Sequence, residues 1–363
     1  MKKLTDVLER GANRRAFLKN GMVAGAVATV GAGILGSGLP AFARQTGSST
    51  LSPGDTAILQ FLAAAEIIES DLWLQYAELG GVTAGAQNPY QLALQQLDSD
   101  GSQYITSNTN DEVSHAAFLN AYLQSKGAAP VNFDKFRTLP SSQATGAKQI
   151  GRLTSLMHLT VDTSWYIRYR SKKNPDFGAT FPQAVNITNR TAIPITNADF
   201  APADHIQAIA DTAAFHFGTI EQGGSTLYSA MAQKANDVEV LRIVVSIGGD
   251  EVAHFLEWVD FAGNAASAPL APLTDPVTGL HIPNLNASGS PLTQTNLIFP
   301  VACEFIDPSL PHCAVIRPTE PDGIAAGVVQ FLTDMGLFTG QSTEFFSTLS
   351  ALATAADAAQ RGF

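Results

Sequence analysis

Cysteine, positive charge and long apolar runs are all scarce in this chain of 363 residues. It has 2 cysteines, and 21 lysines and arginines against 32 aspartates and glutamates. The formal net charge of −11, without any cluster of basic and aromatic residues, makes nucleic acid a poor candidate partner. Two cysteines without a CxxC pair do not support a thiolate metal site. No segment after the N-terminal region is long and apolar enough to predict a membrane span.

The N-terminal region has the pattern of an export signal. Residues 13–19 are NRRAFLK, residues 21–39 form an apolar run rich in glycine and alanine, and AFA at 41–43 offers a cleavage site. The first motif resembles the twin-arginine signal, with Asn13 where serine or threonine is usual. We therefore predict that residues 1–43 engage the twin-arginine translocase and that the protein is periplasmic or secreted. An uncleaved membrane anchor is the alternative.

Cleavage would also change the charge of the protein. Residues 1–43 contain six basic and two acidic residues, so their removal would leave a formal net charge of −15. Such an acidic chain is mildly favourable for attracting cations.

The most informative pattern is a five-residue frame that occurs twice, as DEVSH at 111–115 and DEVAH at 250–254. Each copy lies in a stretch with helical periodicity. A glutamate and a histidine three positions apart lie about 60° apart around a helix, so both can point at one ion. The spacing within each copy is therefore typical of metal ligands, although two amphipathic helix faces would give the same pattern.

Two further glutamates lie in apolar helical stretches. Glu66 is in the middle of 57–79, which is apolar nearly all round, and Glu221 follows the small and aromatic residues from 208 onward. Helical bundles that bind two metal ions take one glutamate from each of two helices and one ExxH pair from each of the other two. The chain has this order. The alternatives are that Glu69 replaces Glu66, and that Glu221 is a charge at a helix end.

This order of motifs resembles the ferritin-like di-metal carboxylate superfamily, most closely its secreted bacterial members, over about residues 55–262. The resemblance implies six metal ligands: Glu66, Glu112, His115, Glu221, Glu251 and His254. Asp111 and Asp250 match an aspartate that bonds a ligand histidine in oxygen-activating members. Ser114 and Ala253 stand where those members have arginine, so the resemblance does not carry their oxygenase chemistry to this chain.

Charge also favours cations at such a site. Four carboxylates in a bundle interior repel one another and lose hydration, so without cations some of them would have to bind protons. Two divalent ions balance four carboxylates. Histidine nitrogen with carboxylate oxygen suits two iron or two manganese ions, while the ligand types alone do not rule out zinc.

The resemblance implies an all-α fold, a ferritin-like four-helix bundle with one long crossover. We predict the bundle at 51–264, with the crossover at about 126–202 and a helical stretch within it at 145–170. The pairs Gly223–Gly224 and Gly248–Gly249 fall inside helices, where each glycine costs about 1 kcal/mol relative to alanine. Close helix approach and a π-bulge are alternative reasons for them.

The remaining residues, 265–363, form a predicted proline-rich extension. It is expected to be mostly loop, with a short strand at 296–299, and to end in helices at 323–335 and 342–359. Cys303 and Cys313 are predicted to form a disulfide that closes a small loop in an oxidising compartment.

These features imply an exported protein whose metal pair reacts with dioxygen or hydrogen peroxide, as a ferroxidase or in peroxide detoxification under envelope stress. The alternative is a structural or desiccation-protective module with little turnover. A multi-subunit iron-storage shell is disfavoured by the bulk of the crossover and tail, and a smaller homo-oligomer is left open. Trp73, Tyr76 and Tyr122 could carry electrons, but core packing is the commoner role of such residues. His216 is expected to be a core or surface residue and not a ligand.

Overall fold

We analysed a computed structural model of the chain. It describes residues 50–84, 88–168, 182–287, 302, 307–312 and 321–362. The predicted signal peptide, Cys303, Cys313 and the predicted strand at 296–299 lie outside these residues. Within the described part of the chain, no helix is both long and apolar enough to cross a membrane.

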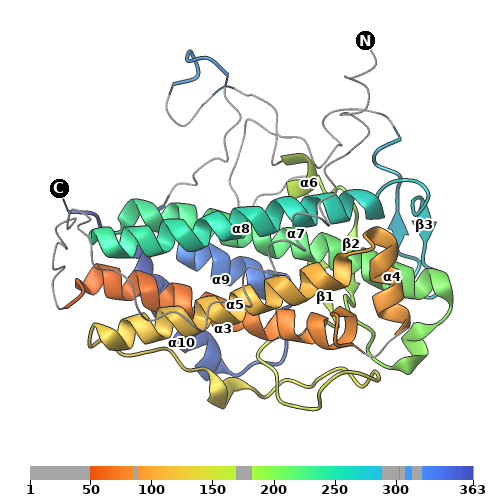
Figure 1. Ribbon diagram of the computed structural model, residues 1–363, viewed down its shortest axis with the longest axis horizontal. Coiled ribbons are helices and arrows are strands. Elements are labelled where there is room, and N and C mark those ends of the chain that lie inside the picture. The colour runs from red at the N-terminus through yellow and green to blue at the C-terminus, as the bar shows by residue number, and fades with distance from the viewer. Residues whose placement is uncertain are drawn as a thin grey trace, which may run out of the picture. The chain divides into compact units, whose positions relative to one another are not determined.

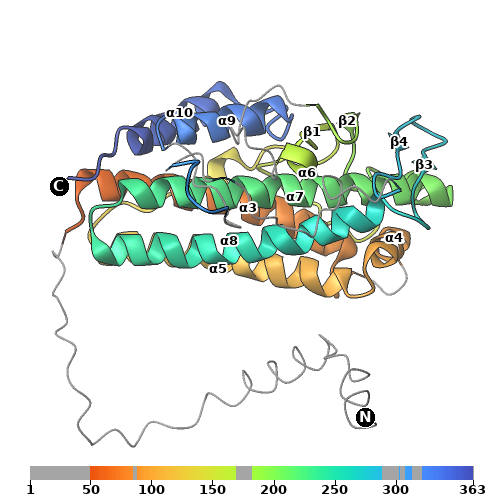
Figure 2. The same cartoon turned by 90° about the horizontal axis from the view of Figure 1, so that it is seen from above.

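Four long helices form a bundle (Figures 1 and 2). They are α3 (Pro53–Gly80), α5 (Gly101–Ser125), α7 (Ala203–Lys234) and α8 (Val238–Ala265). α3 packs mainly against α5, and α7 against α8. A short helix that the sequence did not predict, α4 (Pro89–Leu97), lies between α3 and α5 in the chain. The predicted all-α bundle, with one long crossover between α5 and α7, is confirmed.

Side-chain hydrogen bonds fix where α3 and α8 begin. Pro53 starts α3, and the Ser52 hydroxyl accepts a hydrogen bond from the backbone N–H of Asp55 at 3.0 Å. The Asp55 carboxylate accepts in turn from the backbone N–H groups of Asn236 at 2.9 Å and Asp237 at 3.2 Å, in the turn between α7 and α8. The start of α3 is thus fastened to the start of α8, which aligns the two halves of the bundle.

The crossover differs from its prediction. Within the predicted helical stretch at 145–170, the described residues are helical only in α6 (Trp165–Arg168), and β1 (Leu159–Val161) pairs antiparallel with β2 (Ile187–Arg190). Leu153, Leu156 and Leu159 are buried at a spacing of three residues, which imitates a helix.

Hydrogen bonds explain the irregular course of this segment. The backbone N–H groups of Ser155 and Thr160 donate to the carbonyls of Leu337 and Met335, both at 2.8 Å, and not to the preceding turn. The backbone of this segment is therefore positioned by Met335 and Leu337, which lie just after α9, and its leucines are spaced to pack there.

A buried aspartate on α3 holds the crossover in place. Asp71 accepts hydrogen bonds from the backbone N–H of Leu153 at 3.0 Å and of Thr154 at 2.9 Å, from the Thr154 hydroxyl at 2.7 Å and from Arg137 Nη1 at 2.6 Å. Two turns further along α3, Glu78 forms a buried ion pair with Arg152 at 2.5 Å. The crossover is thereby bonded along the C-terminal half of α3. The smaller elements are η1 (Asp134–Phe136), η2 (Asn197–Phe200) and the β3 (Leu273–Thr274) and β4 (His281–Ile282) hairpin.

Two helices close the described chain, α9 (Ile324–Asp334) and α10 (Thr343–Asp357), as predicted. They lie on the side of α3 and α7, whereas α5 and α8 form the opposite face of the bundle (Figure 2). Phe345 of α10 packs edge-on against Phe133 and Phe136 of the crossover, with ring centroids 5.7 and 5.5 Å apart. The C-terminal helices therefore cover one side of the bundle and leave the α5–α8 side open.

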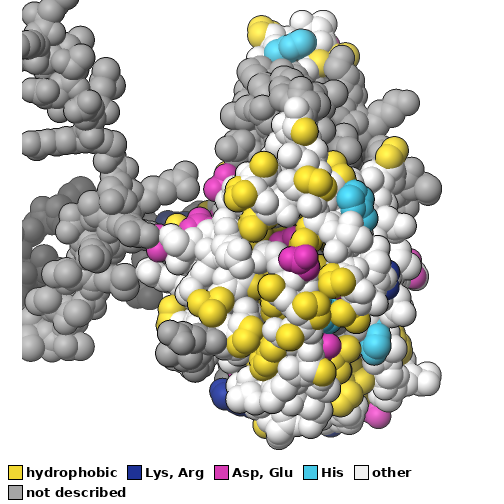
Figure 3. All heavy atoms as spheres, turned by 90° about the vertical axis from the view of Figure 1, so that its right-hand side faces the viewer, with side chains coloured by type: hydrophobic (Ala, Val, Ile, Leu, Met, Phe, Trp, Pro, Cys, Tyr) yellow, Lys and Arg dark blue, Asp and Glu magenta, His cyan; other side chains and the backbone are white. Residues whose placement is uncertain are grey.

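The end of the molecule that carries α4 and β3 shows a surface with few basic side chains (Figure 3). Its visible charged groups are mostly Asp and Glu, set among scattered apolar side chains. The described residues form no basic patch in this view, in agreement with the acidic composition.

Candidate metal centre

The six predicted ligand residues meet in the middle of the bundle. They form two groups whose ligand atoms lie within 4.8 Å of one another: Glu66, Glu112, His115 and Glu251, and Glu112, Glu221, Glu251 and His254. The four glutamates are buried, at 0 or 1% exposed surface. Because both groups share Glu112 and Glu251, these two carboxylates are placed to bridge a pair of ions. Their role as ligands stays a prediction.

His115 lies between the centre and an aspartate of the opposite helix. Its Nδ1 atom faces the carboxylates of Glu112 at 3.3 Å and Glu66 at 3.5 Å. Its Nε2 atom faces Asp250 of α8 at 3.2 Å. The aspartate favours a proton on Nε2, so the lone pair of Nδ1 points into the centre.

His254 has the reciprocal arrangement. Its Nδ1 atom lies 3.1 Å from Glu112 and 3.4 Å from Glu221, and its Nε2 atom lies 3.4 Å from Asp111 of α5. The aspartate of each five-residue frame thus pairs with the histidine of the other frame. This pairing across α5 and α8 is the geometry that would orient both imidazoles toward shared ions.

Two aromatic residues repeat the reciprocal pattern on α3 and α7. Trp73 follows Glu66 by seven positions, and its indole N–H donates to Glu221 Oε1 at 3.0 Å. Tyr228 follows Glu221 by seven positions, and its hydroxyl donates to Glu66 Oε1. Glu66 and Glu221, the two glutamates that belong to only one ligand group each, are therefore each held by an aromatic residue of the facing helix. We call them the terminal glutamates. Tyr228 was missed from the sequence, although the repeated spacing could have indicated it.

Asn108 makes the two halves of the centre unequal. This buried residue lies one turn before Glu112, and its amide donates to Glu112 Oε1 at 2.7 Å and to Glu221 Oε1 at 3.2 Å. Its carbonyl oxygen accepts from the indole of Trp258 at 2.6 Å. The matching position before Glu251 is Ile247, which cannot form such bonds. Asn108 was also missed, because a single asparagine has no distinctive spacing.

Burial and mutual repulsion favour protons in the centre when no cation is present. Burial, together with Glu66 and Glu221, raises the pKa of Glu112 to about 8. Burial and then Glu112 raise the pKa of Glu251 well above its ordinary value. Burial lowers the pKa of His115, but the bonds with Asp250 and Glu112 outweigh it and raise that pKa to about 12. Divalent cations could replace these protons.

Several atoms of the centre lack any hydrogen-bond donor or acceptor. They are Glu66 Oε2, Glu221 Oε2, both carboxylate oxygens of Glu251, and His254 Nδ1. His254 Nδ1 is close to two carboxylates but is not aligned for a hydrogen bond with either. Buried acceptors without donors are costly in a folded protein. This set of buried carboxylate oxygens and imidazole nitrogen fits a pair of divalent ions such as iron or manganese.

Glycines provide the space that the centre occupies. A Cβ atom on Gly224 would lie 2.0 Å from Glu251 Oε2, and one on Gly248 would lie 2.7 Å from the Cβ of Tyr228. α7 and α8 continue as unbroken α-helices through these positions. Close approach between helices therefore explains these two glycines, and no π-bulge is present here.

Three other residues considered from the sequence lie apart from the two groups. Glu69 is half-buried and outside both groups, although burial and the charge of Glu66 raise its pKa well above the ordinary value. Tyr122 is at the surface, where its hydroxyl donates to Glu239 at 2.9 Å. His216 was predicted to be a core or a surface residue and not a ligand. It is a fully buried core residue and belongs to neither ligand group.

A groove of about 940 Å³ leads to the centre from the open α5–α8 side. His115 and Asp250 lie at it, with the apolar side chains of Phe118 and Ile247 and the charged side chain of Arg242 around them. Small solutes can therefore approach His115 from solvent without displacing the C-terminal helices.

Comparison with known proteins agrees with this geometry. A family model described as a ferritin-like domain matches residues 54–258, more than half of the chain and the span that contains all six predicted ligands. Comparisons with curated proteins and with solved structures gave no match. The fold and the buried cluster of glutamates and histidines are those of a metal-binding protein of this kind. The chain belongs to the ferritin-like domain family.

Proposed function

We propose that this protein is an exported redox protein whose centre binds two iron or two manganese ions and reacts with dioxygen or hydrogen peroxide. The observation that supports it most is the pair of buried ligand groups that share Glu112 and Glu251, with carboxylate oxygens that have no donor. When bound, the metal pair supplies the electrons that reduce the oxidant.

The residues around the centre have separate tasks in this proposal. Glu66 and Glu221 would each hold one ion, Glu112 and Glu251 are placed so that both ions could share them, and one histidine would complete each set of ligands. Asp111 and Asp250 retain the Nε2 protons, so that each histidine presents its Nδ1 lone pair. The buried rings of Trp73 and Trp258, stacked with centroids 5.3 Å apart, exclude bulk water from the Glu221 side. Ferrous ions or peroxide would enter by the α5–α8 groove.

In this proposal the twin-arginine signal directs the protein to the cell envelope. The twin-arginine route moves folded proteins, so the ions could be inserted in the cytoplasm before translocation. Replacement of Arg14 and Arg15 by lysine should retain the protein in the cytoplasm, which cell fractionation would show. Unchanged recovery from the periplasm or medium would count against this route.

Metal analysis of the exported protein tests the centre directly. We expect about two transition-metal ions per chain, as in other bundles with this ligand order. Glu112→Ala combined with Glu251→Ala should abolish metal retention, whereas Glu344→Gln, an exposed position with a side chain 66% accessible, should not. Less than one ion per chain after reconstitution with iron and with manganese would contradict the proposal.

Assays of the metal-loaded protein then separate the two functions left open by the sequence. Oxidation of ferrous ion or consumption of hydrogen peroxide, lost in the double variant, supports the redox function. A protein that binds two ions and consumes neither substrate supports the structural or stress-protective module.

A further inference from the structure

A buried tyrosine and histidine form a pair next to the centre that none of the ligand roles uses. The hydroxyl of Tyr76 on α3 lies 2.7 Å from Nδ1 of His216 on α7, and His216 Nε2 lies 3.2 Å from the sulfur of Met335. A thioether sulfur has no hydrogen to donate, so Nε2 carries the ring proton. Nδ1 therefore accepts the hydrogen bond of the Tyr76 hydroxyl.

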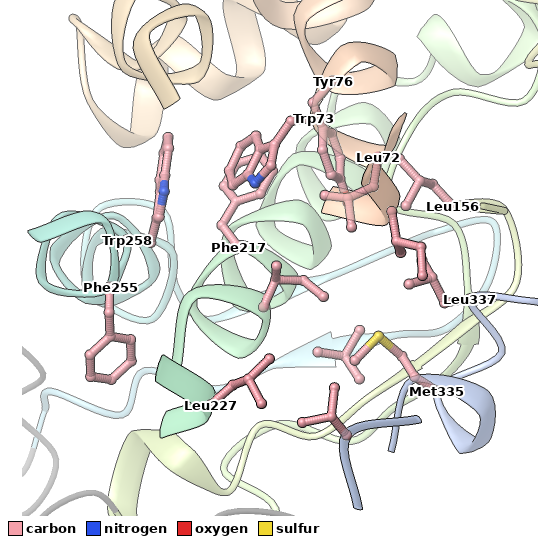
Figure 4. Close-up of a cluster of buried hydrophobic side chains, with 14 of the residues drawn as sticks. Leu72, Trp73, Tyr76, Leu156, Phe217, Leu227, Phe255, Trp258, Met335 and Leu337 are labelled. Carbon is pink, nitrogen blue, oxygen red and sulfur yellow. The ribbon is translucent and has the colours of Figure 1, made fainter. Parts of the chain in front are cut away.

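Aromatic contacts connect this pair to the centre. The ring of Tyr76 lies 5.7 Å from that of Trp73, and Phe217 packs against both, at 4.6 Å from Tyr76 and 4.8 Å from Trp73 (Figure 4). The indole N–H of Trp73 donates to Glu221 at 3.0 Å. A continuous path of ring contacts and hydrogen bonds thus runs from a predicted metal ligand to His216.

The path ends at a second cavity. Met335, whose sulfur contacts His216, lines a cavity of about 410 Å³ between α9 and the β1–β2 segment. Phe331 and Ile187 supply apolar walls, and Asp334 and Gln330 supply polar groups. A small uncharged aromatic molecule with hydroxyl groups matches this lining better than an anion does.

We propose that Trp73, Tyr76 and His216 form a relay that passes single electrons between the metal centre and the cavity at Met335, where a phenol or hydroquinone is the electron donor. This inference rests on the proposed redox function. A one-electron oxidant at the Glu221 end takes an electron from Trp73, and Tyr76 replaces that electron. The hydroxyl proton of Tyr76 moves to His216 Nδ1, which leaves a neutral tyrosyl radical and an imidazolium. An electron from the donor restores Tyr76, the proton returns from His216, and the oxidised donor loses its own proton to solvent.

The surroundings of Tyr76 suit this step better than those of other buried tyrosines. Burial lowers the pKa of His216 to about 3, so its ring is neutral at rest and Nδ1 is free to accept a proton. Tyr90 is equally buried, but its hydroxyl donates to the carbonyl of Ala192 at 2.7 Å, and a peptide carbonyl cannot keep a proton. Tyr90 is therefore a matched control. Tyr228 donates to a carboxylate, so it is best removed from the background.

The test uses metal-free, full-length protein carrying Tyr228→Phe. A ruthenium polypyridyl complex, oxidised by a flash, serves as the one-electron oxidant, and electron paramagnetic resonance detects tyrosyl radicals. We expect a long-lived tyrosyl radical in the parent and in Tyr90→Phe. Tyr76→Phe removes the phenol, so the radical can form only at tyrosines that have no histidine partner. The yield should fall by about tenfold or more, the factor by which one buried hydrogen bond of ordinary strength would favour the radical at Tyr76.

His216→Gln separates the relay from a purely structural contact. A glutamine can accept the Tyr76 hydrogen bond through its amide oxygen but cannot keep the proton, so the radical lifetime should fall about tenfold, by the same reasoning. A radical that persists in Tyr76→Phe, or a lifetime in His216→Gln equal to that of the parent, would overturn the proposal. If His216→Gln does not fold, the comparison of Tyr76→Phe with Tyr90→Phe still decides.

The donor cavity is tested in the same experiment. Added hydroquinone should shorten the radical lifetime in the parent, and Gly327→Trp, which places a large ring at the cavity lining, should remove that effect. Equal quenching in both proteins would exclude the cavity as the donor site. Because the metal-free protein is used, a radical result stands apart from metal binding. A protein that binds less than one ion per chain would contradict the proposed function. A radical that does not depend on Tyr76 or His216 would contradict only the relay.

Discussion

The glutamates and histidines of the centre owe their positions to neighbours that are themselves buried. Asn108 connects Glu112 to Glu221, and Tyr228 and Trp73 each hold a terminal glutamate of the facing helix. Groups fixed in this way have little freedom to lose when a ligand binds. Small changes in these neighbours should therefore alter metal binding more than they alter the fold.

Gly224 offers the sharpest single-residue test of this dependence. Gly224→Ala places a methyl group 2.0 Å from the present position of Glu251 Oε2, so Glu251 must move away from its position between the two ligand groups. We expect a clear loss of bound metal, measured by titration with a divalent ion and elemental analysis. The far-ultraviolet circular dichroism of the helices should stay unchanged.

Gly249 is the matched control, because it lies in the neighbouring helix and a Cβ atom there would meet nothing within 4 Å. Gly249→Ala should retain the metal and raise the free energy of unfolding by about 0.5 to 1 kcal/mol. Equal metal binding by the two variants would contradict the spatial role assigned to Gly224.

Asp211 gives a second prediction at this scale, about pH. It is fully buried on α7, accepts one hydrogen bond from Gln207 at 2.8 Å, and has a second oxygen without a partner. Burial raises the pKa of Asp211 and the hydrogen bond from Gln207 lowers it. Burial is the larger effect, so the pKa rises from 3.8 to about 8. Between these values the folded protein keeps a proton that the unfolded chain has lost, so this group lowers stability as pH rises.

Asp211→Asn removes this titration and supplies amide donors. The free energy of unfolding of the variant minus that of the wild type should grow with pH, by up to about 1.4 kcal/mol per pH unit between about pH 4 and about pH 8. Urea unfolding at several pH values measures it, and other groups titrate equally in both proteins. A difference that does not depend on pH would show that Asp211 ionises normally.

At the scale of elements, Asp71 decides how the crossover meets the bundle. Five donors converge on this buried carboxylate, from Arg137 at 2.6 Å to Gln75 at 3.4 Å. Asp71→Asn removes the closer charge partner of Arg137, which keeps the longer contact with Asp134 at 3.4 Å. The variant should cost about 2 to 3 kcal/mol of unfolding free energy, measured by urea unfolding. Glu344→Gln breaks the exposed pair with Lys135 and should cost less than about 1 kcal/mol. Similar costs in the two variants would mean that Asp71 does not anchor the crossover.

The elements also show where sequence reasoning succeeds. The four bundle helices and the two C-terminal helices were predicted, because their apolar periodicity is sustained over many turns. The helix expected at 145–170 was wrong, since buried leucines at a spacing of three residues occur there on a chain whose N–H groups bond to Asp71 and to the loop after α9. Periodicity reports which side chains are buried, and distant acceptors decide the backbone path.

For the molecule as a whole, the order of four motifs predicted the fold and brought six residues to one point. That prediction worked because metal ligands must lie on facing helices, which fixes their spacing in the sequence. Asn108 was not predicted, because a single hydrogen bond across a bundle leaves no pattern within one segment. Tyr228 was missed although it follows Glu221 by seven positions, the same spacing as Trp73 after Glu66. The C-terminal helices could be predicted as helices, but their position on α3 and α7 depends on contacts such as Phe345 with Phe133.

The centre also sets how the stability of the whole protein depends on pH and metal. In the metal-free protein, burial and then Glu66 and Glu221 raise the pKa of Glu112 from 4.5 to about 8. Between these values the unfolded chain has lost the proton that the folded protein keeps, so the metal-free protein loses stability as pH rises. Cations need the ionised carboxylates, so their binding strengthens over the same range.

The gap in Tm between metal-loaded and metal-free protein should therefore widen from about pH 5 to about pH 8, because a ligand that binds only the folded state stabilises it. Differential scanning calorimetry with and without a chelator measures this gap. Glu112→Gln with Glu251→Gln removes both effects: this variant should melt above the metal-free wild type at high pH and show no response to metal. A gap that narrows with pH, or a metal response that survives in the double variant, would place the ions elsewhere. The buried carboxylates lower the stability of the metal-free bundle, and that stability is regained only when cations bind.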